Sequence, residues 1–349
     1  MEGEVPGATQ SDLQCPRCAG QCGWDPMQGA LVCASCGHAR RVEHLEGSDA
    51  AAEIDYCPHA PDSDAPVLAR SRVHQCQTCG GAVIFAGAAL SERCAYCDGP
   101  VVLAEQDEGY RTMALIPFQL REETARNQMH AWIAGRWAAP PDLAQEVEKG
   151  RIATLYAPFF TFDSREAVRY MGTYTIRRNK RTITRTQRGQ MVTHFDDLLV
   201  PASPHITPLI RDGVLHDFEP DTLRPYHPAY LAGYAAERHH LSVPEGLEAN
   251  AADKDLLLRN RIQDHAGRRL SGITYHTDTT GLRYRRILLP VYILHYTYRG
   301  TQMRVVSCGL RGQTYGERPF SYVKLAGYAA LLTFIALSLG LAWGAAGFL

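Results

Sequence analysis

The pattern of apolar and polar positions predicts helices in the middle of the chain and two blocks of strands. Apolar residues at helical spacing predict helices over residues 119–137, 142–149, 225–236 and 247–268. Alternating positions rich in Tyr, Thr and Val predict strands over residues 168–176, 182–195, 272–279, 283–298 and 302–307. Polar or glycine-containing turns separate them at residues 177–181, 280–281 and 299–300. Antiparallel hairpins interrupted by helices predict the α+β class, with an antiparallel sheet.

The last part of the sequence is apolar on every side. Residues 325–349 contain no charged side chain, and about 20 such residues in a helix cross a bilayer core of about 30 Å. A buried core helix is the alternative, but such helices are seldom this long and apolar on all faces. Arg318 and Lys324 precede the segment and Trp343 lies near its far end, as at membrane interfaces. Residues 321–349 are therefore predicted to form one transmembrane tail anchor.

Eight of the eleven cysteines form an internal repeat. Each copy reads C-x2-C-x14-C-x2-C, and the second copy follows the first at an offset of 61 residues. The eight predicted metal ligands are Cys15, Cys18, Cys33, Cys36, Cys76, Cys79, Cys94 and Cys97. Four thiolates on two tight turns are the closed set that structural zinc prefers, so the repeat predicts two zinc ribbons and two structural Zn2+ ions. Iron in a rubredoxin-like site and C-x-x-C redox pairs are the rival interpretations.

The compartment favours thiolates over disulfides. The first residues are acidic and lack the apolar region of a secretory signal peptide, which indicates a reducing environment. A third metal built from Cys57, His59 and their neighbours is one interpretation of the remaining cysteines, and ordinary loop residues are the favoured one. No role is assigned to Cys22, Cys57 or Cys308, the last of which is expected to pack in a core.

Charge divides the chain into two parts of opposite sign. The 349 residues have a formal net charge of −1, but residues 1–110 hold 16 acids against 6 arginines, a net of −10. Residues 111–349 have a net charge of +9. Phosphate neutralisation by Lys and Arg drives nucleic-acid binding, so the acidic first part favours protein contacts for the ribbons.

One basic run stands out in the second part. Its six cations, with no acid among them, are Arg177, Arg178, Lys180, Arg181, Arg185 and Arg188. With a membrane anchor in the chain, we expect this run to bind an anionic surface, first of all lipid headgroups. A nucleic-acid backbone and a solvated hairpin face are the alternatives. No aromatic residue interrupts the run, which weakens the case for base stacking.

Catalytic motifs are absent or isolated. None of the four lysines follows a glycine, so a G-x-x-x-x-G-K phosphate loop is missing, and no D-E-x-D or D-E-x-H string occurs. Ser321 and Lys324 fit an S-x-x-K string, but beside the bilayer they are interpreted as juxtamembrane residues. His194 and Asp196 share a strand face, where a solvated surface is the favoured interpretation. No catalytic residue is assigned, and the chain is predicted not to be an enzyme.

Four strings resemble a known bacterial family. They are residues 157–163 (APFFTFD), 230–234 (YLAGY), 288–292 (LLPVY) and 316–321 (GERPFS). With the cysteine turns, they resemble bacterial membrane-anchored proteins with zinc ribbons of the transcription-factor-B type, often labelled primosomal protein N′ or superfamily II helicase. Residues 308–312 (CGLRG) depart from the Asn-Gly-x-Thr-Gly of relatives but keep both glycines. The resemblance implies the architecture of zinc ribbons and a membrane anchor. It does not support helicase activity, because the motor motifs of helicases are absent from the sequence.

These observations predict six parts in chain order. They are ribbon 1 (residues 1–48), a linker (49–73), ribbon 2 (74–104), a linker with helices (105–150), the α+β domain (151–320) and the anchor (321–349). The favoured function is a non-enzymatic adaptor on the inner membrane, with its soluble part in the cytoplasm, that presents the ribbons to a protein partner. A nucleic-acid-binding or regulatory zinc-ribbon protein is the alternative, and an enzyme with a site in the α+β domain ranks third. Gly340 and Gly344 form a G-x-x-x-G step that suits a homodimer.

Overall fold

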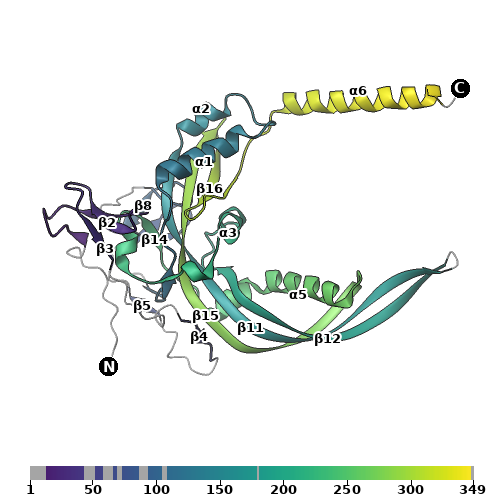
Figure 1. Cartoon of the computed structure of the whole chain (residues 1–349), viewed down its shortest axis with the longest axis horizontal. Coiled ribbons are helices and arrows are strands. Elements are labelled where there is room, and N and C mark those ends of the chain that lie inside the picture. Colours follow the sequence, from purple (N-terminus) through teal and green to yellow (C-terminus); the bar gives the residue numbers. More distant parts are fainter. Residues whose placement is uncertain are drawn as a thin grey trace.

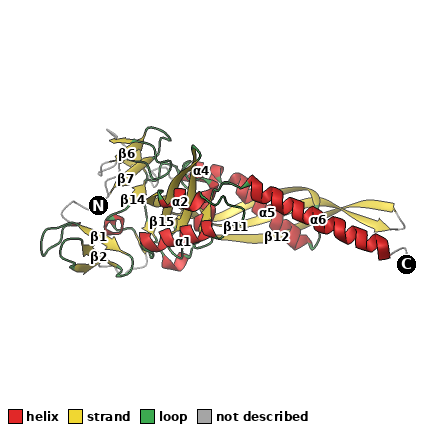
Figure 2. Cartoon of the chain, turned by 90° about the horizontal axis from the view of Figure 1, so that it is seen from above, coloured by secondary structure: helices red, strands yellow, loops and turns green. Residues whose placement is uncertain are grey.

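Figure 1 shows a computed structural model of the chain, in which a central body carries projections at both ends. The structure describes residues 13–42, 52–57, 66–68, 73–85, 93–103, 108–178 and 181–346. Cysteine-rich ribbons lie at one end, and an arm of long strands and the helix α6 (Tyr322–Ala346) extend from the other (Figures 1 and 2). The described residues form an α+β structure, as predicted from the sequence.

Three long strands form the centre of a sheet that has 12 strands among the described residues. They are β11 (Arg151–Arg178), β12 (Arg181–Pro201) and β15 (Ser271–Tyr298). β11 lies between the other two and pairs antiparallel with both, with Phe159 opposite Pro201 on β12 and Ile287 on β15. Runs of Val, Ile, Tyr and Phe in these strands suit a sheet that is buried on both faces in the body.

Shorter strands complete this sheet and form two smaller ones. The large sheet also contains β4 (Ile54–Asp55), β6 (Val73–Cys76), β7 (Ala82–Phe85), β8 (Val101–Leu103), β10 (Ala114–Leu115), β13 (Arg224–Pro225), β14 (Ala235–Glu237), β16 (Thr301–Cys308) and β17 (Thr314–Gly316). The smaller sheets contain β1 (Cys22–Asp25), β2 (Ala30–Cys33) and β3 (Ala39–Arg41), and β5 (Val67–Leu68) with β9 (Glu108–Gly109).

Helices cover both faces of the sheet. The α-helices of the body and arm are α1 (Glu122–Ala134), α2 (Leu143–Glu148), α3 (Pro208–Leu215), α4 (Val243–Ala249) and α5 (Ala251–Ala266), and the 3-10 helices are η4 (Pro220–Thr222) and η5 (Pro228–Leu231). Tyr156 and Tyr292 point to the face that carries α1 and α2, and Phe159 and Ile287 point to the face that carries α3. Ribbon 1 packs into the first of these two cores and ribbon 2 into the second.

The arm, as named here, comprises residues 164–195, with the outer parts of β11 and β12, and residues 251–282, with α5 and the first part of β15. α5 packs on one face of this sheet, where Leu258 and Ile262 contact a cluster that includes Val168, Tyr170 and Phe195. In Figure 1, α5 lies on the side of the arm that faces α6. The opposite face has no covering layer among the described residues.

The helix α6 projects without a covering layer. Its window Tyr322–Trp343 spans 22 residues with a mean hydropathy of 2.0, and none of it is buried. Its first turns contact the body: Lys324 Nζ donates to the carbonyl of Ala139 at 2.7 Å, and Tyr328 lies 5.1 Å from Trp137, ring centre to ring centre. The predicted apolar C-terminal helix is therefore present, long enough to cross a membrane and compatible with an anchor.

Two of the predicted elements are wrong. Residues 225–236 were predicted to be helical, but they contain the end of β13, η5 and the start of β14. Pro225, Pro228 and Gly233, which has a φ of +92°, prevent a continuous helix there. The turn predicted at residues 280–281 is also wrong, because β15 runs through it. Gly281, with a φ of +61°, lies at a bulge between the pairs Asp163–Arg283 and Arg165–Thr280.

Candidate metal centres

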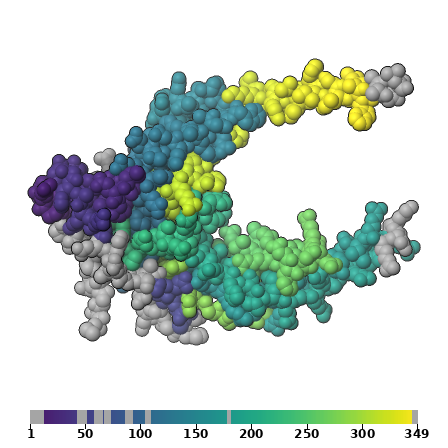
Figure 3. All heavy atoms as spheres, viewed as in Figure 1, coloured from purple at the N-terminus to yellow at the C-terminus, as the bar shows by residue number. Residues whose placement is uncertain are grey.

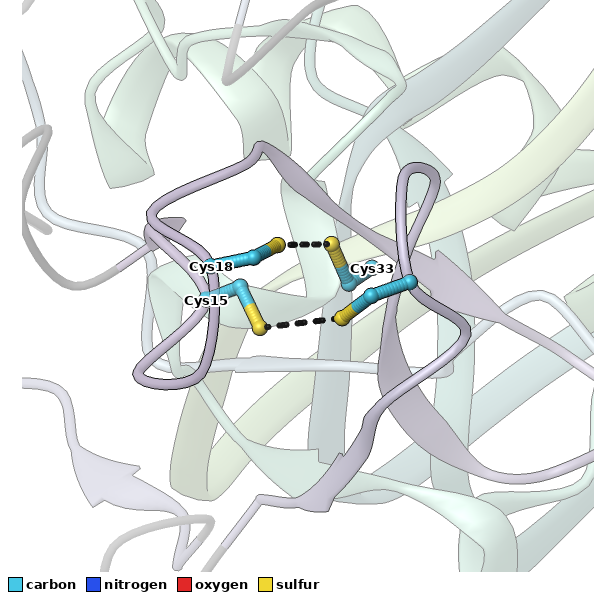
Figure 4. Close-up of side chains that lie close together, drawn as sticks. Cys15, Cys18 and Cys33 are labelled. Carbon is cyan, nitrogen blue, oxygen red and sulfur yellow. Dashed lines mark hydrogen bonds between the residues drawn. The ribbon is translucent and has the colours of Figure 1, made fainter.

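Ribbon 1 gathers its four predicted ligands at the ends of two tight turns. The sulfur atoms of Cys15 and Cys36 lie 3.6 Å apart and those of Cys18 and Cys33 3.5 Å apart (Figure 4). All four sulfurs lie within 4.8 Å of one another. The first turn closes where the Cys15 amide donates to the carbonyl of Gly20 at 2.7 Å, so the four thiols converge on one point.

Ribbon 2 repeats this arrangement with its own four ligands. The sulfurs of Cys76 and Cys97 lie 3.5 Å apart, and those of Cys79 and Cys94 lie 3.8 Å apart. The amide of Cys94 donates to the carbonyl of Gly99 at 2.7 Å, which closes the second turn of this ribbon. The structure thus brings all eight predicted metal ligands together in the two predicted groups of four.

These distances fit zinc and exclude disulfides. A tetrahedron with Zn–S bonds of about 2.3 Å has edges of about 3.8 Å, whereas bonded sulfurs lie about 2.05 Å apart. Backbone N–H groups also point at sulfur, as in the 3.4 Å contact from the Arg17 amide to Cys15 Sγ. The backbone N–H of Cys36, with that of Ser35, lowers the pKa of Cys33 to about 6. The two clusters are therefore consistent with two zinc ions.

Ribbon 1 is attached to the body around one tryptophan. Trp24 Nε1 donates to the carbonyl of Phe118 at 3.2 Å, and its ring meets that of Tyr230 edge-on at 4.7 Å. The Trp24 amide donates to the carbonyl of Ala232 at 2.9 Å. Arg121 forms an ion pair with Asp25 at 2.8 Å beside this contact. The strands of ribbon 1 nevertheless remain a separate sheet.

Ribbon 2 is continuous with the body. Its strand β7 pairs with β14, with Ile84 opposite Ala236. The body also holds the turn that carries Cys94: His295 Nε2 lies 2.8 Å from the carbonyl of Ala95, and Arg151 donates to the carbonyl of Cys94 at 3.1 Å. The fully buried hydroxyl of Tyr96 donates to the carboxylate of Glu237.

The other candidate cysteines lie outside the two groups. Cys22 is buried and pairs across β1 and β2 with the ligand Cys33, and Cys57 is exposed. His59, which the third-metal interpretation requires, lies outside the described residues. Cys308 is fully buried, and burial raises the pKa of its thiol to about 12.

One acidic cluster was not anticipated from the sequence. Carboxylates of Glu53, Asp163 and Asp197 lie within 4.8 Å of one another. The Arg285 guanidinium forms ion pairs with Glu53, at 3.2 Å, and with Asp197. Burial and the neighbouring Asp163 raise the pKa of Glu53 to about 7. Arg285 already supplies a cation to the cluster. We therefore interpret the cluster as a structural contact that holds residues 52–57 against β11 and β15. Its residues are far apart in the sequence, so no local motif indicates it.

The basic run lies at the end of the arm. Arg177, Arg181, Arg185 and Arg188 are exposed on β11 and β12. The side chain of Arg178 and all of Lys180 lie outside the described residues. An anionic ligand for this run stays a prediction.

Comparison with known proteins finds one relative along most of the chain. The chain is similar to a protein of Bacillus subtilis (strain 168) named uncharacterized protein YdjG, with 25% identity over 351 residues. The match covers 93% of this chain and 96% of the relative. No family model and no solved structure matches the chain. The similarity covers far more than one ribbon, and the relative's name states no activity.

Proposed function

We propose that this chain is a membrane-anchored, non-enzymatic zinc protein that presents a zinc ribbon to a cytoplasmic protein partner. The observation that carries the proposal is the presence, in one chain, of two closed groups of four cysteines and a 22-residue apolar helix of which nothing is buried. The helix would hold the protein in the inner membrane, and the thiolate sites favour a cytoplasmic location for the ribbons because that compartment is reducing.

Zinc in these sites would shape a surface rather than perform chemistry. Four sulfurs satisfy a tetrahedral zinc ion completely, so no coordination position remains for a substrate or water. A ribbon of about thirty residues buries little apolar surface, and metal binding then contributes much of its folding free energy. The protein surface that each zinc supports is therefore the candidate functional feature.

Ribbon 1 is the better candidate for partner contacts. It protrudes from one end of the molecule (Figure 3), and Cys18 and Cys36, on its two tight turns, are exposed. Met27, on the turn between β1 and β2, is 68% exposed, and β3 is an exposed edge strand. An exposed methionine and, among the described residues, a strand edge without a partner on the same ribbon suit a protein partner.

In-cell crosslinking of the full chain tests this proposal. We expect Met27→Ser to reduce capture of the partner while the zinc content stays at two per chain. Met171→Ser is the matched control, since Met171 is an exposed methionine on the arm, and it should leave capture unchanged. Equal capture by both variants, a zinc ratio near one, or iron in place of zinc would contradict the proposal.

The orientation is tested separately on intact spheroplasts. Protease added from outside should leave the ribbons uncut if they lie in the cytoplasm. Digestion of the ribbons under these conditions would overturn the proposed topology and the cytoplasmic partner with it.

A further inference from the structure

The arm concentrates the positive charge of the chain. Residues 164–195 and 251–282 together hold thirteen Lys and Arg against five Asp and Glu, a net of +8 in a chain whose net charge is −1. Toward the outer end of β11 and β12 every charged side chain is positive, because residues 169–188 contain seven cations and no acid. Nearly all of the +9 of residues 111–349 therefore lies in one projection.

Cations lie on both faces of the hairpin end. Side chains alternate between the faces of a strand, so the register places Arg177 and Arg188 opposite the face that carries α5. The same register places Arg181 and Arg185 on the α5 face. All four are exposed, and none of them forms an ion pair with a residue that the structure describes. This end of the arm can meet an anionic surface from either side.

The tyrosines of the arm are engaged with α5 and the loop after it. The hydroxyl of Tyr170 lies 2.9 Å from Nδ1 of His265, and the guanidinium of Arg268 lies 4.4 Å above the ring of Tyr174. Tyr275 donates a hydrogen bond to α5 through its hydroxyl. The register places mainly Arg and Thr, with Met171, Val192, His194 and His276, on the opposite face. No Phe, Tyr or Trp lies there as a platform on which the bases of a single strand could stack.

The outer edge of β12 adds backbone donors to these charges. Among the described residues β12 pairs only with β11, which leaves alternate amides of residues 181–195 without a partner strand. Phosphate oxygens accept hydrogen bonds from both arginine and backbone N–H groups. The edge therefore complements a surface of phosphate groups.

The position of α6 identifies where such a surface lies. The arm and α6 leave the body in the same direction (Figures 1 and 3). Hydrocarbon accepts the apolar α6 but excludes charged side chains and unpaired strand edges. The arm therefore cannot accompany α6 through a bilayer and has to turn aside at the headgroups.

We propose that the arm binds anionic phospholipid headgroups of the same bilayer that holds α6. Arg177, Arg181, Arg185 and Arg188 would face the phosphates, and the arm would lie along the membrane surface. This inference rests on the proposed membrane anchoring and adds a second attachment that depends on lipid composition. Two attachments would fix the orientation of the body, which carries ribbon 1 at the end opposite the arm (Figure 2).

Hydrogen exchange of the full chain in lipid nanodiscs tests the inference. One set of discs contains phosphatidylcholine alone and the other also contains phosphatidylglycerol. Amides of residues 181–195 should exchange more slowly in the anionic discs, and high salt should remove the difference. Replacing Arg181, Arg185 and Arg188 together by Gln should abolish the slowing, because each arginine near an anionic surface strengthens binding about fivefold.

Two further variants separate charge from other effects. Lysine at the same three positions should keep the slowing, since the contact depends on charge. Glutamine in place of Arg17, Arg41 and Arg224 removes the same charge from exposed positions outside the arm and should also keep it.

Four results would overturn the inference. Equal exchange in the two kinds of disc, or slowing that survives the triple Gln variant, removes the lipid contact. Slowing by duplex DNA in phosphatidylcholine discs that matches the effect of anionic lipid reassigns the surface to nucleic acid. If the chain does not enter the discs, the anchor and the proposed function are overturned as well. If the chain enters the discs but its exchange does not depend on the lipid, only the arm contact is overturned.

Discussion

Ribbon 1 and ribbon 2 share one cysteine spacing but join the body in different ways. Ribbon 1 keeps its own sheet of β1, β2 and β3 and is attached through side-chain and backbone contacts around Trp24. Ribbon 2 contributes β6, β7 and β8 to the large sheet, and β7 pairs directly with β14. Ribbon 1 is a docked module, whereas ribbon 2 is part of the domain itself.

The predicted metal ligands of the two ribbons also differ in their exposure and support. In ribbon 1, Cys18 and Cys36 are exposed, whereas in ribbon 2 Cys94 is fully buried and its turn is held by the body. A repeated motif can thus supply a surface in one copy and a structural support in the other. Loss of metal should have local consequences in ribbon 1 and global ones in ribbon 2.

The largest expected effect is that of Cys94→Ser. A structural zinc contributes about 10 kcal/mol or more to the folding of a small zinc domain, and at ribbon 2 that free energy also supports the sheet. We expect the variant to lose one zinc and to exchange amide hydrogens faster in β14 and in the adjacent part of β11. Hydrogen exchange with mass spectrometry and elemental analysis measure both.

Two variants serve as controls for this prediction. Cys18→Ser should release the zinc of ribbon 1 without accelerating exchange in β14. Cys57→Ser changes an exposed cysteine outside both groups and should alter neither quantity. If exchange in β14 is unchanged after Cys94→Ser, ribbon 2 is as separable as ribbon 1 and the comparison fails.

A second prediction uses a buried charge in the arm, outside both groups of four cysteines. Burial opposes ionisation of Glu166, but hydrogen bonds from Lys254, Thr279, Ser164 and Thr277 outweigh it and lower its pKa to about 2. Breaking a buried ion pair by removing one partner costs about 3 to 5 kcal/mol, so Glu166→Gln should lower the free energy of unfolding by that amount. Denaturant unfolding measures the loss. The zinc content should remain two, and a lower content would mean that the arm and the ribbons unfold together.

The pH dependence of this ion pair has a definite sign. The folded pKa of Glu166 lies below its ordinary value of 4.5, so the stabilisation is complete above pH 4.5 and is lost as the pH falls toward about 2. Zinc sites also release metal in acid, so the informative quantity is the difference between the parent chain and Glu166→Gln. That difference should shrink over this pH range.

The sequence was sufficient for the local features. A C-x2-C turn depends only on neighbouring residues, so the spacing alone predicted which eight cysteines converge. The apolar helix was equally visible, because crossing a bilayer sets a length and a composition that can be counted directly. Alternation likewise predicted strands at residues 168–176, 182–195 and 272–279 of the arm, but not that β11 and β15 continue from the arm into the body.

Contacts between distant segments were not predictable from one sequence. Trp24 meets Phe118, and Tyr96 meets Glu237, across long stretches of chain that carry no signal of the pairing. The sum of charge over residues 1–110 was also too coarse, since residues 13–42 of ribbon 1 hold three arginines and one aspartate. Of the 16 acids, 13 lie outside residues 13–42 and 74–104.

A third prediction tests whether ribbon 1 is only docked. Trp24→Ala removes the hydrogen bond to Phe118 and the ring contact with Tyr230. We expect the docking of ribbon 1 to weaken by about 2 to 3 kcal/mol, because Trp24 is partly buried, while both zinc ions stay bound. Faster proteolysis between ribbon 1 and the body, at an unchanged zinc content, would show this. Trp137→Ala changes an exposed tryptophan near α6 and should leave that cleavage unchanged.

The smallest expected effect is that of Asp25→Asn at the same contact. The Arg121 guanidinium holds the pKa of the Asp25 carboxyl below its usual range, so the ion pair stabilises docking at neutral pH and this contribution is lost in acid. In the parent chain, a carboxylate oxygen of Asp25 accepts a hydrogen bond from the Met27 amide at 2.9 Å. The Asn side chain keeps an oxygen for this bond and removes only the charge. Exposed ion pairs contribute little and are screened by salt, so proteolysis should accelerate less than in Trp24→Ala. High salt should accelerate it in the parent chain and leave the variant unchanged, and an equal salt response in both would show that the ion pair does not contribute to docking.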